Sequence, residues 1–419
     1  MENIVLIDDV FKTSRGLPEN YIYRKHVDEL FLTSLTKGNH IVIYGSSKQG
    51  KTSVRKKNLL ETDYITVMSS NNWTLGDLHE AILKQAGYEV KVSEQKTLKG
   101  TNKVNLSIKM NDIGGTFELS NELAKQINRK NIEFDPENVN DVITALKEIN
   151  FNKYIVIEDF HYLDDKTKVD FSIALKAFHE ESAFTFIIVG VWLDDDKLTT
   201  YNGDLTGRII SINADIWTDD NFRDLISESE ALLNISYSET FKEKCLSLCN
   251  GNVFLLQQIC HKACSLKNIF RTQEDLTDVG DDIDVSNEIS QILEIQSGRF
   301  NKFLMDFSIG FGPTELELYK WIVYILISVD DRHFENGLPV PAIRREIQKV
   351  HPKKDEVSDR KLIGALNRAV QLQCELKIKP IIIEFDGNRA RLKVVDKSFL
   401  LWKKFKQSDE LFDLADIKL

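Results

Sequence analysis

The chain has 419 residues, 42% of them hydrophobic, and a formal net charge of −11. This length suffices for two or three domains, and the negative charge argues against a protein that coats nucleic acid with its whole surface. No apolar run reaches the roughly 18 residues of a membrane span, and the acidic N-terminus does not look like a secretory signal. Five cysteines, four of them clustered, do not form a secreted disulfide framework. We therefore expect a protein of the reducing cytoplasm that makes no membrane contact.

The first predicted element with a chemical signature is an apolar strand, 40–44, that runs into a glycine-rich turn. The turn reads GSSKQGKT and fits the pattern GxxxxGK[ST]. Its glycines let backbone NH groups surround phosphate oxygens at the start of a helix predicted over 52–60. Lys51 would place a charge beside the β and γ phosphates, and Thr52 would offer a hydroxyl to Mg²⁺. The remaining members of the turn, which would line the phosphate site, are Gly45, Ser46, Ser47, Lys48, Gln49 and Gly50.

This pattern predicts an ATP and Mg²⁺ site. A glycine turn without a ligand is the alternative interpretation.

Two acids provide the second signature. Glu158 and Asp159 come directly after a buried strand predicted over 154–157, and the carboxyl ends of parallel strands border the ligand crevice of an open α/β sheet. One carboxylate would hold Mg²⁺, and the other would deprotonate the attacking water. Position favours Glu158 for the metal and Asp159 for the base. The usual order is Asp-Glu, however, so the two roles can be exchanged, and an exposed acidic turn is the alternative interpretation.

The remaining segments of this region alternate between strands and helices. Such alternation predicts an α/β fold, a P-loop NTPase core with a mostly parallel sheet flanked by helices. An insertion at about 101–120 alternates apolar and polar residues around two glycines and predicts a β-hairpin, either decorative or in contact with a partner. The further strands are predicted at 64–70, 184–192 and 207–212, and the further helices at 75–88, capped by Thr74, and at 138–149.

These motifs resemble those of the AAA+ and STAND branch of P-loop ATPases, which includes origin-recognition-like and archaeal-type ATPases. The resemblance covers most of residues 15–270 and also rests on the stretches YIYRKHVDELFLTSL, FIIVGVWL, GDLTGRIISI and CNGNVFLLQQIC. It implies adenine contacts at Tyr23 and Arg24. It also implies that Arg208 reaches a γ-phosphate, in its own subunit or a neighbour's; a structural salt bridge at a strand start is the alternative.

The chain departs from this branch at the end of the fourth core strand. Gly190, Val191 and Trp192 stand where AAA+ proteins usually have a polar sensor, and the lid lacks its arginine sensor near Gly251. These departures favour a STAND-like switch over a continuously cycling motor.

The resemblance and the composition together predict four parts: an ATPase core over 1–218, a helical lid over 219–275, a linker over 276–313 and a winged-helix domain over 314–419. The predicted lid contains Cys245, Cys249, Cys260 and Cys264 within apolar helical runs. Buried packing is the favoured interpretation of these cysteines, and a zinc site is the alternative.

The last part of the chain is basic, since residues 340–407 contain 17 Lys and Arg against 8 Asp and Glu. Its predicted order of helix, strand, two helices and a two-stranded wing is that of a winged helix. A recognition helix in such a domain enters the major groove, while flanking cations contact phosphates. Double-stranded DNA is therefore a candidate partner, and a surface that binds only protein is the alternative. The candidate DNA-binding residues are Lys353, Lys354, Arg360, Lys361, Arg368, Arg389 and Arg391, with Lys393 also on the wing.

The sequence thus predicts an ATP-binding, slowly hydrolysing regulatory switch that acts on DNA or on a protein partner supplying the effector activity, with homo-oligomerisation open. Chains of this kind resemble ATPase components of bacterial mobile-element and antiphage systems. The alternatives are a DNA-loading AAA+ ATPase of the origin-recognition or transposition-regulator type, a protein-only signalling switch, and a nucleotide-binding scaffold without hydrolysis.

Overall fold

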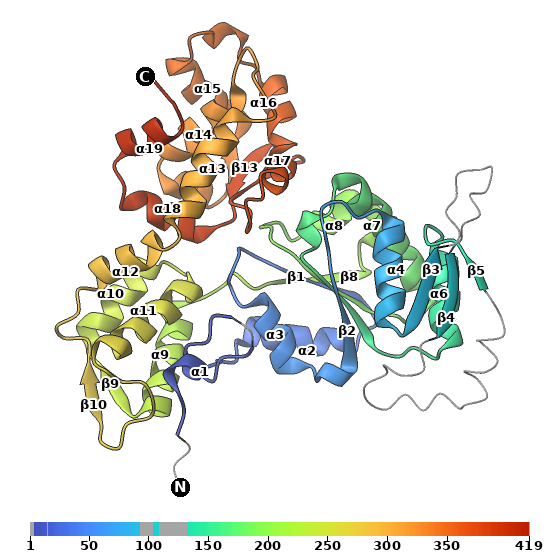
Figure 1. Cartoon of the computed structure of the whole chain (residues 1–419), viewed down its shortest axis with the longest axis horizontal. Coiled ribbons are helices and arrows are strands. Elements are labelled where there is room, and N and C mark those ends of the chain that lie inside the picture. Colours follow the sequence, from blue (N-terminus) through green and yellow to red (C-terminus); the bar gives the residue numbers. More distant parts are fainter. Residues whose placement is uncertain (1–3, 15, 93–103, 109–131, 419) are drawn as a thin grey trace.

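A computed structural model describes residues 4–14, 16–92, 104–108 and 132–418. Figure 1 shows three bodies: a core with a central sheet, a helical lid beside it, and a C-terminal domain, orange to red, that lies against both. No helix among these residues is long and apolar enough to cross a membrane.

The core is built on a five-stranded parallel sheet in the order β2-β6-β7-β1-β8. This confirms the predicted α/β class. The strands are β1 (His40–Tyr44), β2 (Tyr64–Met68), β6 (Tyr154–Glu158), β7 (Phe186–Val189) and β8 (Ile209–Asn213). The helices of the core are α2 (Leu30–Leu35), α3 (Lys51–Asn58), α4 (Leu75–Gln85), α6 (Val139–Glu148), α7 (Asp165–Glu181) and α8 (Lys197–Tyr201).

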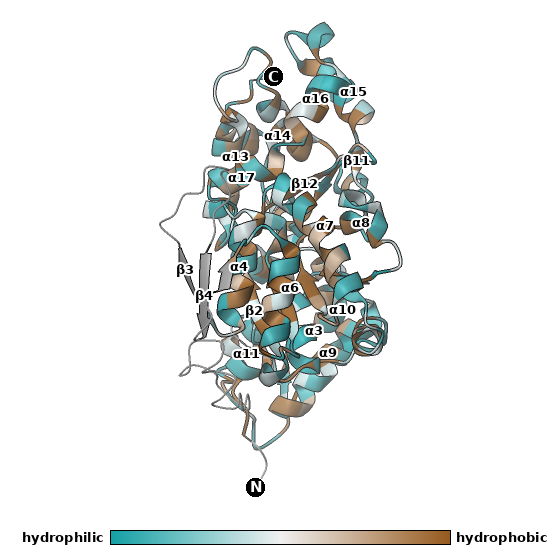
Figure 2. Ribbon diagram, turned by 90° about the vertical axis from the view of Figure 1, so that its right-hand side faces the viewer, coloured by the Kyte–Doolittle hydropathy of each residue, from teal (hydrophilic) through white to brown (hydrophobic). Residues whose placement is uncertain are grey.

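Helices cover both faces of this sheet, which explains why β1 is buried along its whole length. Val42 packs in one cluster with α4, α6 and α7, while its neighbours Ile41 and Ile43 pack on the other face with α2 and α3. This alternation follows from the two-residue period of a strand. In Figure 2, brown hydrophobic stretches lie around β2, α6 and α7 of the core.

The predicted strand 184–192 is shorter in the structure, because β7 ends at Val189. A Cβ on Gly190 would lie 1.6 Å from Cζ3 of Trp192, so only glycine allows the indole to fold back here. Trp192 is consequently buried. A packed indole thus occupies the place where the resemblance would put a polar sensor.

A small antiparallel sheet in the order β3-β4-β5 extends the core at the insertion. Its strands are β3 (Tyr88–Val92), β4 (Val104–Ile108) and β5 (Ile132–Phe134). β4 pairs with β3 on one side and β5 on the other. The predicted hairpin turn at Gly114–Gly115 lies outside the described residues.

The lid consists of helices α9 to α12 with a two-stranded parallel sheet, and the short helix α1 (Ile7–Val10) packs on it. All four clustered cysteines are buried and free, and burial raises the pKa of each thiol. No metal-binding cluster occurs in the described parts of the chain, which agrees with core packing. The lid elements are α9 (Asp219–Leu233), β9 (Ile235–Tyr237), α10 (Glu239–Cys249), α11 (Val253–Leu266), β10 (Thr277–Val279) and α12 (Val285–Glu294).

Much of the predicted linker, 276–313, is folded. α12 packs against α10 and α11, and α13 (Ser297–Ile309) packs against α14 (Leu318–Ser328) of the C-terminal domain. Apolar side chains such as Phe300, Phe303 and Phe307 recur at helical spacing and are fully buried. The acidic, turn-rich start of the segment obscured this periodicity.

The C-terminal domain has its elements in the predicted order, and its three strands form a sheet in the order β11-β13-β12. The predicted second helix is broken at Asn367–Arg368 into α16 and α17, and Ser358 caps α16. The elements after α14 are β11 (Leu338–Pro339), α15 (Val340–Val350), α16 (Asp359–Leu366), α17 (Ala369–Glu375), β12 (Ile383–Asp386), β13 (Arg391–Val394), α18 (Lys397–Lys404) and α19 (Ser408–Leu414).

Candidate functional site

The turn after β1 has the backbone conformation that its glycines predict. Gly45 and Gly50 have φ angles of +141° and +83°, which residues with a Cβ rarely adopt. A Cβ on Gly45 would also lie 3.1 Å from the backbone nitrogen of Asp215. Gly50 is the N-cap of α3, so the NH groups that lack a partner within that helix begin at this turn. The turn therefore presents the positive end of a helix dipole.

Lys51 is the first residue of α3, and its side chain folds back on the turn. Its Nζ donates to the carbonyl oxygens of Gly45 at 3.0 Å and Ser46 at 2.5 Å. Burial lowers the pKa of Lys51 to about 8, against an opposing influence of nearby carboxylates. A buried ammonium group that donates to carbonyls rather than to a carboxylate is well suited to bind an anion.

The other members of the turn are held in place by contacts with distant parts of the chain. The Ser46 hydroxyl donates to Asp215 at 2.6 Å, and the Gln49 carbonyl accepts from the Trp217 indole at 3.4 Å. Lys48 lies 3.8 Å from the centre of the Phe254 ring, in the lid. Ser47 donates its backbone NH to the carbonyl of Val395, in the C-terminal domain, at 3.2 Å. Core, lid and C-terminal domain thus all meet at this turn.

A cavity of about 340 Å³ opens beside the turn, a volume within the range of small-molecule sites. Three parts of the chain line it: the N-terminal segment, the turn with α3, and the lid. Several lysines among the lining residues give the cavity a positive character. The residues that matter most here are Lys12, Asn20, Tyr21, Arg24, Lys48, Gln49, Gly50, Lys51, Thr52, Lys56, Trp217, Phe254 and Gln257.

Buried polar residues that the sequence analysis missed hold this cavity together. The Asn20 amide donates to Ser229 and to Gln257, both at 2.9 Å, and the Gln257 amide donates back to Asn20 at 2.8 Å. These bonds fasten the N-terminal segment to the lid. Because these polar residues lie more than 200 positions apart in the sequence, no local pattern indicates that they pair.

The predicted adenine contacts differ in the structure. Tyr23 is 53% exposed and does not line the cavity, whereas Tyr21 does. Arg24 lines the cavity but is held by other contacts, since it lies 4.0 Å from the Trp217 ring centre and donates to the Ala214 carbonyl at 2.8 Å. Arg24 therefore supports the cavity wall, and Tyr23 takes no part in it.

The acid pair lies where β6 ends. Glu158 is buried, and its Oε1 accepts from Arg55 of α3 at 3.1 Å. Asp159 has a φ of +58°, an uncommon conformation for a residue with a side chain. Burial raises the pKa of both carboxyl groups; Arg55 opposes this at Glu158, and Lys379 and Lys51 oppose it at Asp159. Buried acids with raised pKa values are typical of groups that accept a proton.

Arg208 is not brought to this site within the chain. Its backbone carbonyl accepts from His40, at the start of β1, whereas the turn follows the end of that strand. The guanidinium group pairs with Glu180 at 2.7 Å. The structure thus shows the salt bridge at a strand start, and a role at the γ-phosphate of the same chain is ruled out by position.

Asp215 is a further acid of the site that the sequence analysis missed. It follows β8, accepts from Ser46, and is the carboxylate that most strongly raises the pKa of Lys51. Lys397 of the C-terminal domain lies 4.0 Å from its Oδ1. An acid at the end of the fifth core strand is the signal that could have indicated it.

The candidate DNA-binding residues fall into two groups, and the first group lies between residues 353 and 368, on α16 and beside it. Arg360 and Lys354 are exposed, and Lys353 pairs with Glu315 at the surface. Arg368 lies 3.7 Å from the Phe311 ring centre. Lys361, also exposed, donates to the Glu356 carbonyl at 3.1 Å.

The second group comprises the cations of the hairpin formed by β12 and β13, which we call the wing after its predicted role, and these cations make contacts within the chain. Arg389 pairs with Asp194 at 2.7 Å and with Asp196 at 2.8 Å, both in the core. Arg391 donates to the carbonyl of Gly337 at 2.8 Å, within its own domain. The wing therefore faces the core in this conformation.

No protein-family model matches this sequence, and no curated protein resembles it. In structure, the chain is similar to a Walker-type ATPase of Pyrococcus abyssi, with a TM-score of 0.52 and 13% identity, over 94% of this chain and 100% of that one. This chain has the fold of the P-loop ATPases.

Two further structures align over nearly the whole chain but with weaker agreement. The Aeropyrum pernix ORC1 protein in complex with DNA has a TM-score of 0.42 at 11% identity, covering 96% of each chain. Cdc6p from Pyrobaculum aerophilum has a TM-score of 0.39 at 14% identity, covering 98% of this chain and 99% of that one.

The residues present fit a nucleotide with its metal ion. The turn offers glycine conformations and a buried ammonium group beside the cavity, which are the features a triphosphate needs. Thr52, on the cavity wall, and Glu158 would hold Mg²⁺, which prefers hydroxyl and carboxylate oxygens.

Proposed function

We propose that this P-loop protein is an ATP-binding and slowly hydrolysing regulatory ATPase. The proposal rests on one observation: the buried ammonium group of Lys51 folds over a glycine turn that opens into a positively charged cavity. The acid pair that ends β6 lies close enough to influence the pKa of Lys51.

The chain's own residues have distinct tasks in this proposal. When bound, Mg²⁺ would neutralise charge on the triphosphate. Thr52 and Glu158 would hold the metal, and Lys51 would bind the β and γ phosphates. Asp159 takes a proton from the attacking water, a role favoured by its raised pKa and by the fact that Arg55 already occupies one oxygen of Glu158. Arg208 would act only on a neighbouring subunit's nucleotide.

We also propose that the output of the switch passes through the C-terminal domain, interpreted as a winged helix, to double-stranded DNA. Arg360, Lys361 and Lys354 would contact phosphates from the exposed side of the domain. A switch that binds only protein is a second candidate, because Arg389 is paired with core carboxylates and is not free to bind phosphate in this conformation.

Phosphate release, measured with and without duplex DNA, tests these proposals. Wild type should release phosphate slowly, and Lys51→Ala should release none. Phosphate release by Lys51→Ala at the wild-type rate would rule out this site, and binding of ATP without release would leave a nucleotide-binding scaffold. DNA that neither binds nor changes the rate at low salt would leave the protein-only switch.

A further inference from the structure

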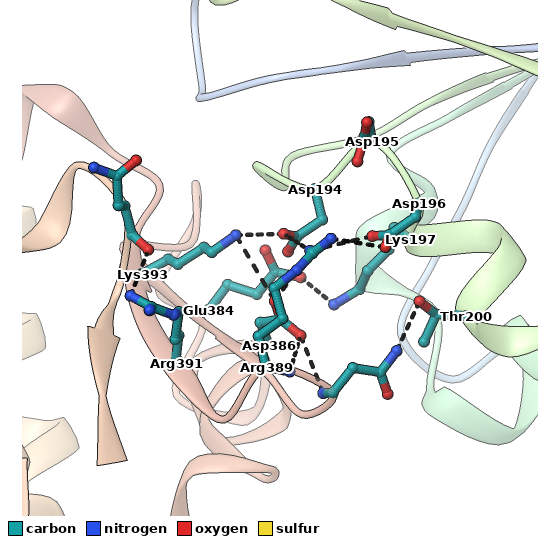
Figure 3. Close-up of polar contacts among 12 residues, drawn as sticks. Asp194, Asp195, Asp196, Lys197, Thr200, Glu384, Asp386, Arg389, Arg391 and Lys393 are labelled. Carbon is teal, nitrogen blue, oxygen red and sulfur yellow. Dashed lines mark hydrogen bonds and ion pairs between the residues drawn. The ribbon is translucent and has the colours of Figure 1, made fainter. Parts of the chain in front are cut away.

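The wing of the C-terminal domain docks on the segment that follows β7, and Figure 3 shows this contact. Arg389 extends toward Asp194 and Asp196, with N–O distances of 2.7 and 2.8 Å. Lys393 points at the same Asp194 carboxylate and pairs with it. We call the cluster formed by Asp194, Asp196, Arg389 and Lys393 the wing latch.

Two more contacts flank the wing latch and cross the same interface. Lys197, the first residue of α8, pairs with Glu384 of β12 at 2.5 Å. The Asn388 amide donates to the Thr200 hydroxyl at 2.9 Å. Core and wing are therefore joined by polar contacts from both sides.

Burial makes the pair of Asp194 and Lys393 more than a surface ion pair, whereas Arg389 and Asp196 are each 46% exposed. Asp194 and Lys393 have side-chain exposures of only 5% and 9%. A buried charge that loses its partner is strongly destabilised, so the docked arrangement depends on both partners being charged. The wing latch can thus be opened by a competitor that offers equivalent charge.

The chemistry of the latch indicates which competitor fits. An arginine guanidinium binds carboxylate and phosphate with the same planar pair of donors. Asp194 presents its carboxylate to both Arg389 and Lys393, and Asp196 presents a second carboxylate to Arg389, as neighbouring phosphates of a duplex would present successive negative groups. These acids therefore occupy the cations that a phosphate backbone would use.

Docking also brings the C-terminal domain to the glycine-rich turn at residues 45–52, which we call the phosphate turn. Tyr162 and Val191, which follow the core strands β6 and β7, pack with Ile381 and Val395 of the C-terminal domain. The same Val395 accepts a hydrogen bond from the turn at Ser47. A movement of the turn would therefore change the packing at this interface.

We propose that Asp194 and Asp196 autoinhibit the wing by mimicking nucleic-acid phosphates, so that docking on the core and binding of double-stranded DNA exclude each other. This inference rests on the DNA-binding part of the proposed function and adds its regulation. Release of the wing exposes Arg389 and Lys393 to the duplex and leaves them one acid partner in their own domain, Asp386 of β12, at 3.4 and 3.9 Å.

A reversible cross-link gives the sharpest test. Thr200→Cys with Asn388→Cys places two thiols across the interface at side chains already in contact. The five native cysteines are all buried, so mild oxidation acts on the introduced pair. The full-length oxidised protein should bind a 20-base-pair duplex about tenfold more weakly than the same protein after reduction. Equal affinity in the two states would overturn the proposal.

A charge test complements the cross-link. Asp194→Asn with Asp196→Asn should tighten duplex binding about tenfold at low salt. The slope of log affinity against log salt concentration should become steeper by about two, one for each released cation. The matched control is Asp409→Asn with Glu410→Gln, which makes the same charge change at exposed positions of α19. If the control tightens binding as much as the latch variant, general charge explains the effect and the proposal is wrong.

Nucleotide binding is measured on the same samples with a fluorescent ATP analogue. Loss of ATP binding with intact competition at the wing would contradict the proposed ATPase and leave this inference standing. Normal ATP binding, with a latch variant that ignores duplex DNA and binds only a protein, would overturn the inference and leave the ATPase standing.

Discussion

The phosphate turn and the wing are both cationic sites that the sequence assigns to phosphates, yet their side chains are engaged differently. Lys51 in the turn donates to backbone carbonyls of its own loop. Arg389 in the wing is held by carboxylates of a segment almost 200 residues away. The ammonium group of the turn is held by backbone carbonyls, whereas the charge of the wing is neutralised by carboxylates from another part of the chain.

This difference shows how far a local pattern can be trusted. The turn is determined by glycines, a strand and a helix start that are adjacent in sequence, so its geometry follows from its own residues. The wing's charges depend on what packs opposite them. A cation count alone therefore indicates that a surface attracts anions, but not whether that surface is free.

The largest expected effect concerns the acids beside the turn. Asp159→Asn should reduce the rate of phosphate release by roughly 10²–10⁴-fold, because the amide that replaces the carboxylate cannot accept a proton from water. Nucleotide affinity should be preserved, so the variant should retain ATP in a filter-binding assay. Glu158→Gln is the matched variant and should mainly raise the Mg²⁺ concentration needed for half-maximal activity. The opposite pattern would exchange the two roles.

Removal of the ammonium group tests whether the turn is a ligand site at all. Lys51→Ala should weaken ATP binding by about 100-fold or more, since two charge-assisted contacts are lost. Isothermal titration calorimetry measures this directly. Lys244→Ala, at an exposed position of the lid, provides the control and should bind ATP like wild type. Similar ATP affinities for the two variants would contradict the assignment. The turn would then carry a cation that binds no phosphate.

The lowered pKa of Lys51 predicts a pH dependence for ATP binding. The pKa is about 8, below the ordinary value of 10.5, so the charged form is lost as the pH rises through 8. Affinity should be constant below this pH and fall by up to about tenfold per unit above it. Fluorescence titrations between pH 7 and pH 9.5 measure the effect, and Lys51→Arg, which keeps its charge, should give a flat profile. A wild-type profile without a break near pH 8 would contradict the assignment.

The smallest expected effect concerns the exposed cations of the C-terminal domain. Arg360→Ala should reduce the slope of log affinity for duplex DNA against log salt by about one, because one phosphate contact disappears. Lys349→Ala, at an exposed ion pair on α15, is the control and should leave the slope unchanged. An unchanged slope for Arg360→Ala would place α16 outside the DNA interface. Neither α16 nor the docked wing would then bind phosphate, in contrast to the turn.

Much of the core was predictable because its signals are local and periodic. The strands before Gly45 and Glu158 lie at or within one residue of the predicted positions, and Thr74 caps its helix as expected. The folded segment 276–313 was missed because its acidic first part obscured the apolar spacing of α13. The resemblance indicates a segment, whereas the direction of each side chain depends on packing, and Tyr23 accordingly lies outside the lining of the cavity.

The sequence by itself determined the glycine turn, the acid pair and the alternation of strands and helices, since each depends on residues close together in the chain. Tertiary structure decided the rest. It joined Asn20 to Gln257, paired Glu158 with Arg55, and placed Asp194 against Arg389. Such pairings depend on which distant surfaces meet when the domains bury their apolar faces, and no local spacing encodes that choice.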